Sequence, residues 1–313
     1  MIDRSIRITA TAPTAIPTPP FPGFSYLSSL RRGDVIEIQG PSGSGKTHLL
    51  YYLVCSCILP PHFGGWNKVS VIFDTDGSFD VYRLRALLES RLIQYIPSHN
   101  DSAGQIISVA LRNVHLFRPG SSLHLAAGLA NLPTYHFSNL QTSEIALLAI
   151  DSLSAFHWLD RFSVERHRSA PVSNISQITL TALQNFHRSH RPIMVFLTWG
   201  PGVRAAFQLC KLQLPSYSTL MSRSWPFPEV INETHISLTH QITLNLPRAY
   251  PSPHNVAASE GENEQCMSPL ARHVDIVANV KVAMDQGEIL VMQIAQDRVV
   301  IRMGDDSAPV SEE

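Results

Sequence analysis

The feature that most constrains this chain is a glycine-rich loop between an apolar strand and an apolar helix. The alternating run Val35–Gln39 leads into Gly40-Pro41-Ser42-Gly43-Ser44-Gly45-Lys46-Thr47, which matches G-x-x-x-x-G-K-[ST] without a gap. In such a loop, successive backbone N–H groups surround phosphate oxygens, and the following helix presents its positive N-terminal end to the same anion. The alternative is a chance Gly/Ser-rich turn, but the strand before it and the helix after it argue against that. We therefore predict a phosphate-binding loop formed by Gly40, Pro41, Ser42, Gly43, Ser44, Gly45, Lys46 and Thr47.

The residue types around this loop predict ATP and Mg²⁺ as cofactors. Lys46 is expected to reach the terminal phosphates, and Thr47 to hold Mg²⁺. Asp151 follows the continuous apolar run 145–150, where the second acidic motif of P-loop enzymes is expected, so we predict it as a metal ligand. The alternative is that the Asp151 side chain only caps the turn that follows the strand.

A water-activating carboxylate is harder to find. Many P-loop ATPases have Glu directly after the metal-binding Asp, but here Ser152 follows Asp151. The best candidate for the catalytic base is Asp76, just beyond the apolar run 69–73. Because Asp is one methylene shorter than Glu, we expect slow hydrolysis or none. The alternative is that Asp74 and Asp76 only form an Asx-type turn with Gly77.

The order of apolar segments predicts the fold class. Buried strands at 35–39, 69–73, 113–117, 145–150 and 193–198 alternate with helical patterns, and shorter strands follow between 236 and 302. This favours an α/β fold, a mostly parallel sheet covered by helices on both faces, with an antiparallel C-terminal edge. The expected helices include 80–95, 121–132 and 176–190, with 97–108 a polar loop and the start of the next element and 133–143 a loop.

Composition shifts divide the chain into a core and flanking segments. Residues 1–23 are Pro-rich and are expected to form a flexible tail. Residues 24–303 form the predicted core, in which 247–273 is polar and is expected to be a disordered insertion. Residues 304–313 form a second tail.

Charge and cysteine usage exclude several classes. The net charge of −1 argues against a protein that coats DNA by itself. Cys55 and Cys57 are two residues apart on a predicted helix, so they point to different sides and form neither a disulfide nor a metal pair. The fourteen His show no zinc-ligand spacing, and we expect surface and core histidines. No apolar run is long enough to span a bilayer, and the N-terminus lacks a signal-peptide pattern.

Several motifs together resemble the RecA-type recombinases and, among them, a eukaryotic recombinase paralogue. Residues 73–79 repeat the frame Asp-Thr-Glu-Gly-x-Phe of these proteins with Asp76 in place of Glu. The phosphate loop, the run 57–60 and above all Ile150–Arg161 resemble the same paralogue. The similarity covers roughly residues 33–200.

This resemblance implies a RecA-like ATPase core without the small helical N-terminal domain of the full-length recombinases. It implies a nuclear protein that joins other recombinase paralogues, among them the one designated D, in a hetero-oligomer assisting homologous recombination and double-strand break repair. It also implies contact with single-stranded or branched DNA, shared with partners, through two loops that carry Arg161, Arg166, Arg168 and Arg204. Trp199 stands where recombinases usually place Asn or Gln to sense the terminal phosphate, a second reason to expect weak ATP turnover.

The alternative is a self-sufficient motor or phosphotransferase, such as a hexameric RecA-like helicase, a DNA-dependent ATPase or a P-loop kinase. Such a protein needs a working base, and usually an arginine finger or a substrate lid. Hydrolysis by the isolated chain, or a ring of subunits, would favour this alternative.

Overall fold

A computed structural model describes residues 30–93, 95, 101–156, 159–160, 162, 173–198, 238–245, 274–282, 288–294 and 298–303. The predicted tails 1–23 and 304–313 and the predicted insertion 247–273 lie outside the described residues.

The described strands form one sheet in the order β3-β2-β4-β5-β1-β6-β7-β8-β9. The neighbours from β3 to β6 run parallel, and the pairs from β6 to β9 run antiparallel. The bounds are β1 Val35–Gln39, β2 Val69–Asp74, β3 Val114–Phe117, β4 Ile145–Asp151, β5 Ile193–Thr198, β6 His240–Leu244, β7 Val274–Val282, β8 Glu288–Ile294 and β9 Val299–Met303. The predicted mostly parallel sheet with an antiparallel C-terminal edge is therefore confirmed.

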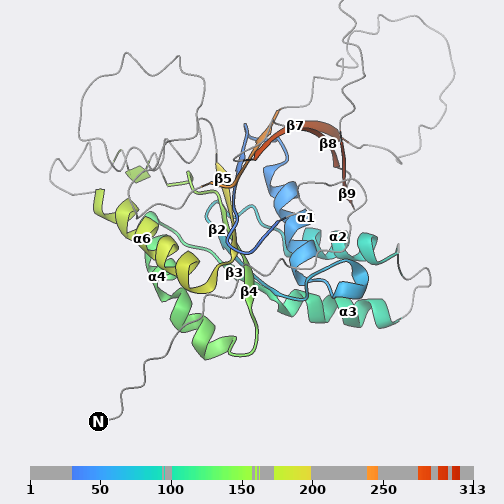
Figure 1. The fold of residues 1–313 in the computed structure, drawn as a ribbon, viewed down its shortest axis with the longest axis horizontal. Coiled ribbons are helices and arrows are strands. Elements are labelled where there is room, and N and C mark those ends of the chain that lie inside the picture. Colours follow the sequence, from blue (N-terminus) through green and yellow to red (C-terminus); the bar gives the residue numbers. More distant parts are fainter. Residues whose placement is uncertain are drawn as a thin grey trace, which may run out of the picture.

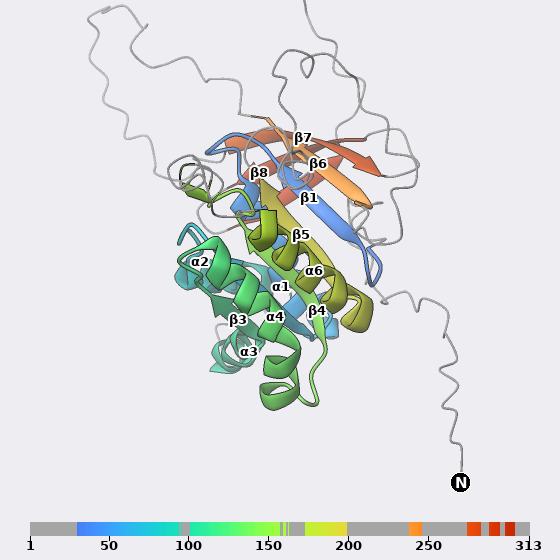
Figure 2. The same cartoon turned by 90° about the vertical axis from the view of Figure 1, so that its left-hand side faces the viewer.

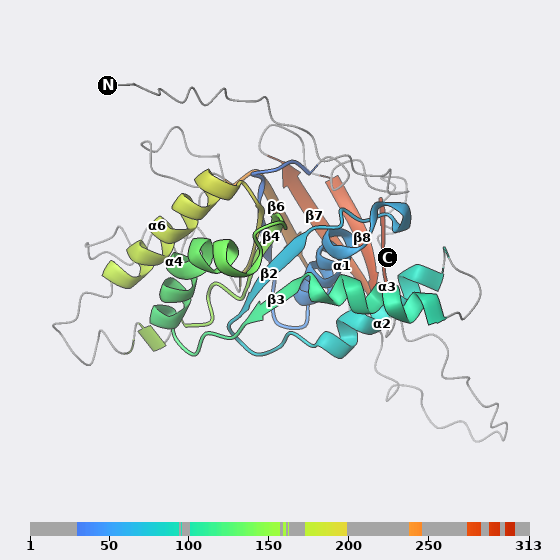
Figure 3. The ribbon, with the colours of Figure 1, turned by 90° about the horizontal axis from the view of Figure 1, so that it is seen from below.

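Helices cover both faces of the parallel part (Figures 1 and 3). On one face lie α1 (Lys46–Ile58), α2 (Val81–Ile93) and α3 (Asp101–Arg112), with the short 3-10 helix η2 (Pro61–Phe63) after α1. On the other face lie α4 (Ser122–Asn139) and α6 (Ser173–His190), side by side in Figure 2. The central strands are buried on both sides, which explains their continuous apolar sequence.

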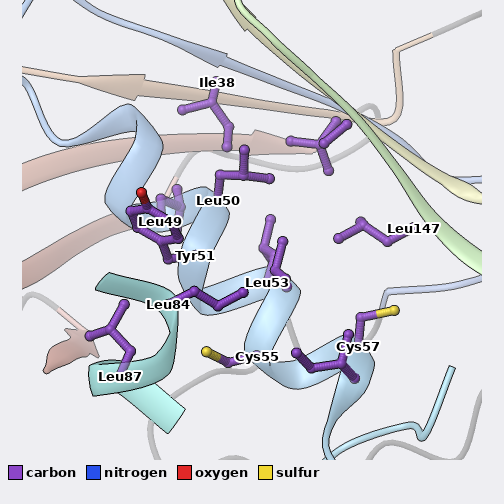
Figure 4. Packing of buried hydrophobic residues seen from close by; sticks show 14 of the residues in the cluster. Ile38, Leu49, Leu50, Tyr51, Leu53, Cys55, Cys57, Leu84, Leu87 and Leu147 are labelled. Carbon is purple, nitrogen blue, oxygen red and sulfur yellow. The ribbon is translucent and has the colours of Figure 1, made fainter. Parts of the chain in front are cut away.

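The larger core lies around α1. Figure 4 shows Leu50 and Leu53 of α1 near Ile38 and Leu147 of the sheet, with Leu84 of α2 on the other side of the helix. Because α1 is buried almost all round, its position relative to the sheet is fixed by packing on several sides. This rigid placement matters because α1 begins within the phosphate loop.

The predicted placement of Cys55 and Cys57 on different sides of their helix is confirmed. Cys55 and Cys57 are buried free thiols, and their sulfur atoms lie on different sides of α1 (Figure 4). Burial raises the pKa of Cys55 to about 12, and it also raises the pKa of Cys57, so both thiols stay protonated at neutral pH.

Two helix predictions were wrong in their bounds. Helix α3 occupies 101–112, most of which was expected to be a loop, because its apolar residues Ile107 and Ala110 pack into the core beside α2. Helix α4 does not end at Leu132 but runs through Pro133 to Asn139. Pro133 is exposed while Leu125, Leu129 and Leu132 are buried, so packing of the inner face outweighs the backbone hydrogen bond that proline cannot donate.

Candidate nucleotide site

The loop between β1 and α1 has a backbone that only glycine permits at two positions. A Cβ on Gly40 would lie 2.5 Å from Ser44 Oγ and 2.7 Å from the carbonyl oxygen of Leu244. Gly45, at the N-terminal cap of α1, has a φ of 85°, in the left-handed region that glycine favours. The loop therefore turns tightly, and its backbone continues directly into the first turn of α1.

The antiparallel edge of the sheet supports this loop. A Cβ on Gly45 would lie 2.7 Å from the Cδ1 atoms of Ile276 and Ile294 and 3.0 Å from Cε of Met292. Strands β7 and β8 thus pack directly against the beginning of α1. This contact between the C-terminal hairpin and the loop was not predicted from the sequence, because more than 200 residues separate the two segments.

Lys46 lies folded over the loop. Its Nζ donates hydrogen bonds of 2.8 Å to the carbonyl oxygens of Gly40 and Pro41. Burial lowers the pKa of Lys46, while the charges of Asp151 and Asp76 act in the opposite direction. A lysine held in this place is positioned to pair with an anion bound in the loop.

Thr47 and Asp151 meet as the sequence analysis expected. Thr47 Oγ1 donates a 2.8 Å hydrogen bond to Asp151 Oδ2, which joins the first turn of α1 to the end of β4. Burial raises the pKa of Asp151 to about 7; the hydrogen bond from Thr47 opposes this change, and the charges of Asp76 and Asp74 add to it. A hydroxyl and a carboxylate side by side, in a site where the carboxylate lacks full charge compensation, are suitable ligands for a divalent cation.

Asp76 lies near this pair, but its carboxylate has a local role. The side chain is exposed, and Oδ1 accepts a 3.0 Å hydrogen bond from the backbone N–H of Ser78. This is the geometry of the Asx-type turn that the sequence left open as the alternative for Asp76. The charge of Asp76 nevertheless acts on both Lys46 and Asp151, so the carboxylate stands within electrostatic reach of the loop.

Ser152 is used structurally. Its backbone N–H donates a 2.6 Å hydrogen bond to Thr75 Oγ1, and Thr75 Oγ1 donates a 2.7 Å hydrogen bond back to the carbonyl oxygen of Ser152. The backbone N–H of Thr75 also donates to the carbonyl oxygen of Asp151 at 2.7 Å. Thr75, which the sequence analysis did not single out, therefore ties the end of β2 to the end of β4.

A second residue that the sequence analysis missed is Asp74. Its side chain is fully buried, and Oδ2 accepts a 3.0 Å hydrogen bond from Nε of Arg118, while Oδ1 has no partner among the described residues. Asp74 and Asp151 are paired in register on neighbouring parallel strands. The sequence signal was present, since Asp74 ends an apolar strand, but only the sheet order brings Arg118 and Asp151 to it.

The remaining predicted site residues are not placed. Trp199 and the four predicted DNA-contacting residues, Arg161, Arg166, Arg168 and Arg204, lie outside the described residues. The residues that are described fit a nucleotide with Mg²⁺. The tight turn leaves no room for a side chain at position 40, Lys46 is positioned for phosphate, and Thr47 with Asp151 offers two oxygen ligands.

No protein-family model matches the chain. Over 140 residues, 45% of this chain and 47% of the relative, it is 38% identical to DNA repair protein XRCC2 of Mus musculus. Over 209 residues, 55% of each chain, it is 31% identical to an XRCC2 homolog of Arabidopsis thaliana.

More distant similarity reaches human DNA repair protein RAD51 homolog 2, which is 31% identical over 86 residues, 28% of this chain and 21% of the relative. These matches make the chain similar to RecA-type recombinase paralogues. It spans about half the length of the two XRCC2 proteins that it matches. The names of those proteins therefore apply to them and are not transferred to this chain. The described helices include none that is long and apolar enough to cross a membrane.

Proposed function

We propose that this chain is a nucleotide-binding subunit of a recombinase-paralogue complex that assists homologous recombination and the repair of DNA double-strand breaks in the nucleus. The names of its relatives, DNA repair proteins of the XRCC2 and RAD51 groups, support the process. The bond of Thr47 to Asp151 beside the loop that holds Lys46 is the observation that supports nucleotide binding.

In this proposal, the backbone of Gly40–Thr47 and Lys46 hold the phosphates of ATP, and Thr47 and Asp151 hold Mg²⁺. The bound cation would neutralise charge on the phosphates and compensate the carboxylate of Asp151. Lys46 would exchange its two backbone carbonyl partners for phosphate oxygens.

The same proposal includes weak or absent hydrolysis. The carboxylate of Asp76 is short, exposed and already bonded to the N–H of Ser78, so it is a poor choice for holding an attacking water. Ser152 offers no carboxylate and is engaged with Thr75. Nucleotide binding would then serve assembly of the complex more than turnover.

Equilibrium binding of a fluorescent ATP analogue to the purified full chain tests the nucleotide part. We expect Mg²⁺-dependent binding that weakens by at least about tenfold in Lys46→Ala, because a charge-assisted phosphate contact is worth roughly 1.5–3 kcal/mol. Lys68→Ala is a matched control, since Lys68 pairs with Glu144 at the far end of β2 and should leave binding unchanged. Equal affinity of Lys46→Ala and the wild-type chain would overturn the proposed site.

Co-purification tests the complex. We expect the chain to be recovered from cells together with other recombinase paralogues, and ATP turnover by that complex to change little in Asp76→Asn. Rapid turnover by the isolated chain that collapses in Asp76→Asn would instead support a self-sufficient motor. Failure to recover any recombinase paralogue would argue against membership of such a complex.

A further inference from the structure

An uncharged groove lies between α4 and α6, which run side by side on the face of the sheet opposite α1 (Figure 2). It consists of two hollows of about 590 and 480 Å³. Pro133 lines both hollows, so together they form one groove, which we call the α4–α6 groove. His136 of α4 and His190 of α6 line the second hollow and are hydrogen bonded, with 3.2 Å between Nδ1 and Nε2. No Asp, Glu, Lys or Arg is among the described residues that line either hollow.

The groove presents apolar rings and chains together with amide donors. Phe137 is 75% exposed and Ile178 is 48% exposed, although both are large hydrophobic residues. The side-chain amides of Asn185 and Gln141, which can donate hydrogen bonds, line the same groove. Pro-rich segments dock in grooves of this kind, because their rings pack on aromatic side chains and their backbone carbonyls accept hydrogen bonds.

The described chain begins next to this groove. Leu30 is buried, with 2% of its surface exposed, and therefore fixes the chain at this point. Arg32 Nη2 donates a 3.0 Å hydrogen bond to the carbonyl oxygen of His190, and His187 Nε2 donates one of 2.8 Å to the carbonyl oxygen of Gly33. Because His190 also lines the groove, the segment that precedes Leu30 is attached at one end of the groove.

The composition of that segment matches the groove. Residues 10–29 contain no charged residue, and their five prolines lie within Pro13–Pro22. The other long segments outside the described residues all contain charged side chains: 163–172, 199–237, 246–273 and 304–313. Moving a charge into an uncharged groove costs free energy that an uncharged segment avoids. Composition and attachment therefore indicate the same occupant.

The segment is long enough to reach along the whole groove. From Ile178 to His190, α6 extends about 18 Å, at about 1.5 Å per residue. A Pro-rich extended chain covers about 3.1 Å per residue, so about six residues follow that length. The residues between Leu30 and Pro22 can span up to about 25 Å at the same rise. Pro13–Pro22 can therefore lie in the groove without movement of Leu30.

Attachment favours the segment of the same chain over that of a second copy. A short flexible connection gives a tethered segment an effective concentration in the range of about 1 mM. In a solution of about 10 μM protein, the segment of a second copy is present at roughly a hundredfold lower concentration. A contact too weak to form between two molecules is therefore populated within one molecule.

We propose that residues 13–24 of this chain dock in the α4–α6 groove. The proline and phenylalanine rings of the segment pack against Phe137 and Ile178, and its backbone carbonyls accept hydrogen bonds from Asn185 and Gln141. The segment thereby covers apolar side chains that the rest of the described chain leaves exposed. The groove and the phosphate loop are on different elements and opposite faces of the sheet, so this docking is independent of the proposed nucleotide binding.

Photo-crosslinking of the purified full chain at about 10 μM tests the proposal. Benzoylphenylalanine in place of Phe137 keeps an aromatic ring at this exposed position and captures the segment that lies against it. We expect cross-linked peptides that join position 137 to residues 13–24 in a band of monomer mass. Benzoylphenylalanine in place of Tyr82, an exposed aromatic residue of α2 on the opposite face, is the control and should give no such peptide.

Two results of this experiment would overturn the proposal. The first is the absence of cross-links between position 137 and residues 13–24. The second is the presence of these cross-links only in a band of dimer mass, which would assign the groove to the segment of a second copy. Both results can be read from the chain with benzoylphenylalanine at position 137 alone, so they do not depend on the folding of any further variant.

A charge placed in the groove provides a second test. In the chain with benzoylphenylalanine at position 137, Ile178→Glu should lower the yield of the cross-link about tenfold or more, because the uncharged segment would have to cover a carboxylate. Val109→Glu, the same kind of change at an exposed position of α3, is the matched control and should leave the yield unchanged. Equal yields in these two variants would contradict docking in the groove. ATP-analogue affinity should be the same in Ile178→Glu and the wild-type chain, so failure of this proposal and failure of the proposed nucleotide site are separately observable.

Discussion

At the scale of single residues, the candidate site brings three acidic groups together, of which Asp74 pairs with Arg118. Asp151 and Asp74 are buried next to each other in register, and Asp76 lies close enough to act on Asp151. The hydrogen bond from Thr47 and the charge of Lys46 offset only part of the free-energy cost of ionising the buried Asp151. Residues arranged for binding a cation commonly reduce the stability of the ligand-free protein, and a test of Asp151 can measure that reduction.

We predict that Asp151→Asn stabilises the ligand-free chain at high pH and loses that advantage in acid. The folded-state pKa of Asp151, about 7, lies above its ordinary value of 3.8, so the folded state binds the proton more tightly than the unfolded state. The contribution of Asp151 to stability is therefore largest below about pH 4 and falls as the pH rises through 7. Urea unfolding in EDTA should show the advantage of Asp151→Asn growing by about 1–3 kcal/mol between pH 5 and pH 8.

Glu144→Gln provides the control for this measurement, because Glu144 is half-exposed and lies at the opposite end of β4. A pH-independent difference between Asp151→Asn and the wild-type chain would contradict the raised pKa. The same Asp151→Asn chain should lose the Mg²⁺ dependence of ATP-analogue binding. The unfolding measurement then reports the effect of Asp151 on stability, and the binding measurement reports its role as a metal ligand.

At the scale of elements, α4 shows tertiary packing overriding a local signal. Pro133 lies inside this helix, where it cannot donate to the carbonyl of Leu129. The helix continues because its inner face packs against β2 and β3, and because Tyr135, beyond the proline, contacts Phe117 and accepts or donates a 2.8 Å hydrogen bond with His115 Nδ1. The contacts on the C-terminal side of Pro133 hold the last turns in place.

We predict that Pro133→Ala raises the free energy of unfolding by about 1–3 kcal/mol, because alanine restores the backbone donor and has a higher helix propensity. The midpoint of urea unfolding measures this change. Thr134→Ala, at the neighbouring exposed position, is the control and should change stability by no more than about 0.7 kcal/mol. A loss of stability in Pro133→Ala would show that the ring of Pro133 packs favourably in its pocket beside α6.

At the scale of the whole molecule, the C-terminal hairpin packs against the loop of the candidate nucleotide site. The side chains of Ile276 and Met292 belong to the same core as α1, and they approach the backbone of Gly45. The parallel sheet provides the loop, and the antiparallel edge supports it from the outside. The family resemblance covers roughly residues 33–200, so this support comes from a part of the chain that the resemblance reaches only loosely.

We predict that Met292→Ala lowers the free energy of unfolding by about 2–4 kcal/mol, because it opens a cavity in the core. It should also weaken ATP-analogue binding, because the cavity borders the beginning of α1. Chemical unfolding and the binding assay measure the two effects. Arg298→Ala, an exposed position next to β9, should change neither. Unchanged nucleotide affinity in a destabilised Met292→Ala would mean that the hairpin supports the fold without supporting the loop.

The sequence alone predicted the glycine-rich loop between β1 and α1, the order of most strands and helices, and the meeting of Thr47 with Asp151. These follow from short spacings, from periodicity and from the rule that parallel strands end at one edge of a sheet. Most of α3 and the second half of α4 were not predicted as helix. The polar residues before α3 and Pro133 in α4 are typical of loops, but packing against the core keeps both segments helical.

Only the tertiary structure decided which side chains complete the sites. Arg118 reaches Asp74, Thr75 after β2 bonds to the backbone of Asp151 and Ser152 at the end of β4, the hairpin meets Gly45, and His136 meets His190 across 54 residues of chain. None of these contacts has a sequence spacing that could reveal it, because each joins segments that only the sheet order and helix packing bring together. For the same reason, the spacing of the fourteen histidines in the sequence did not predict the contact of His136 with His190.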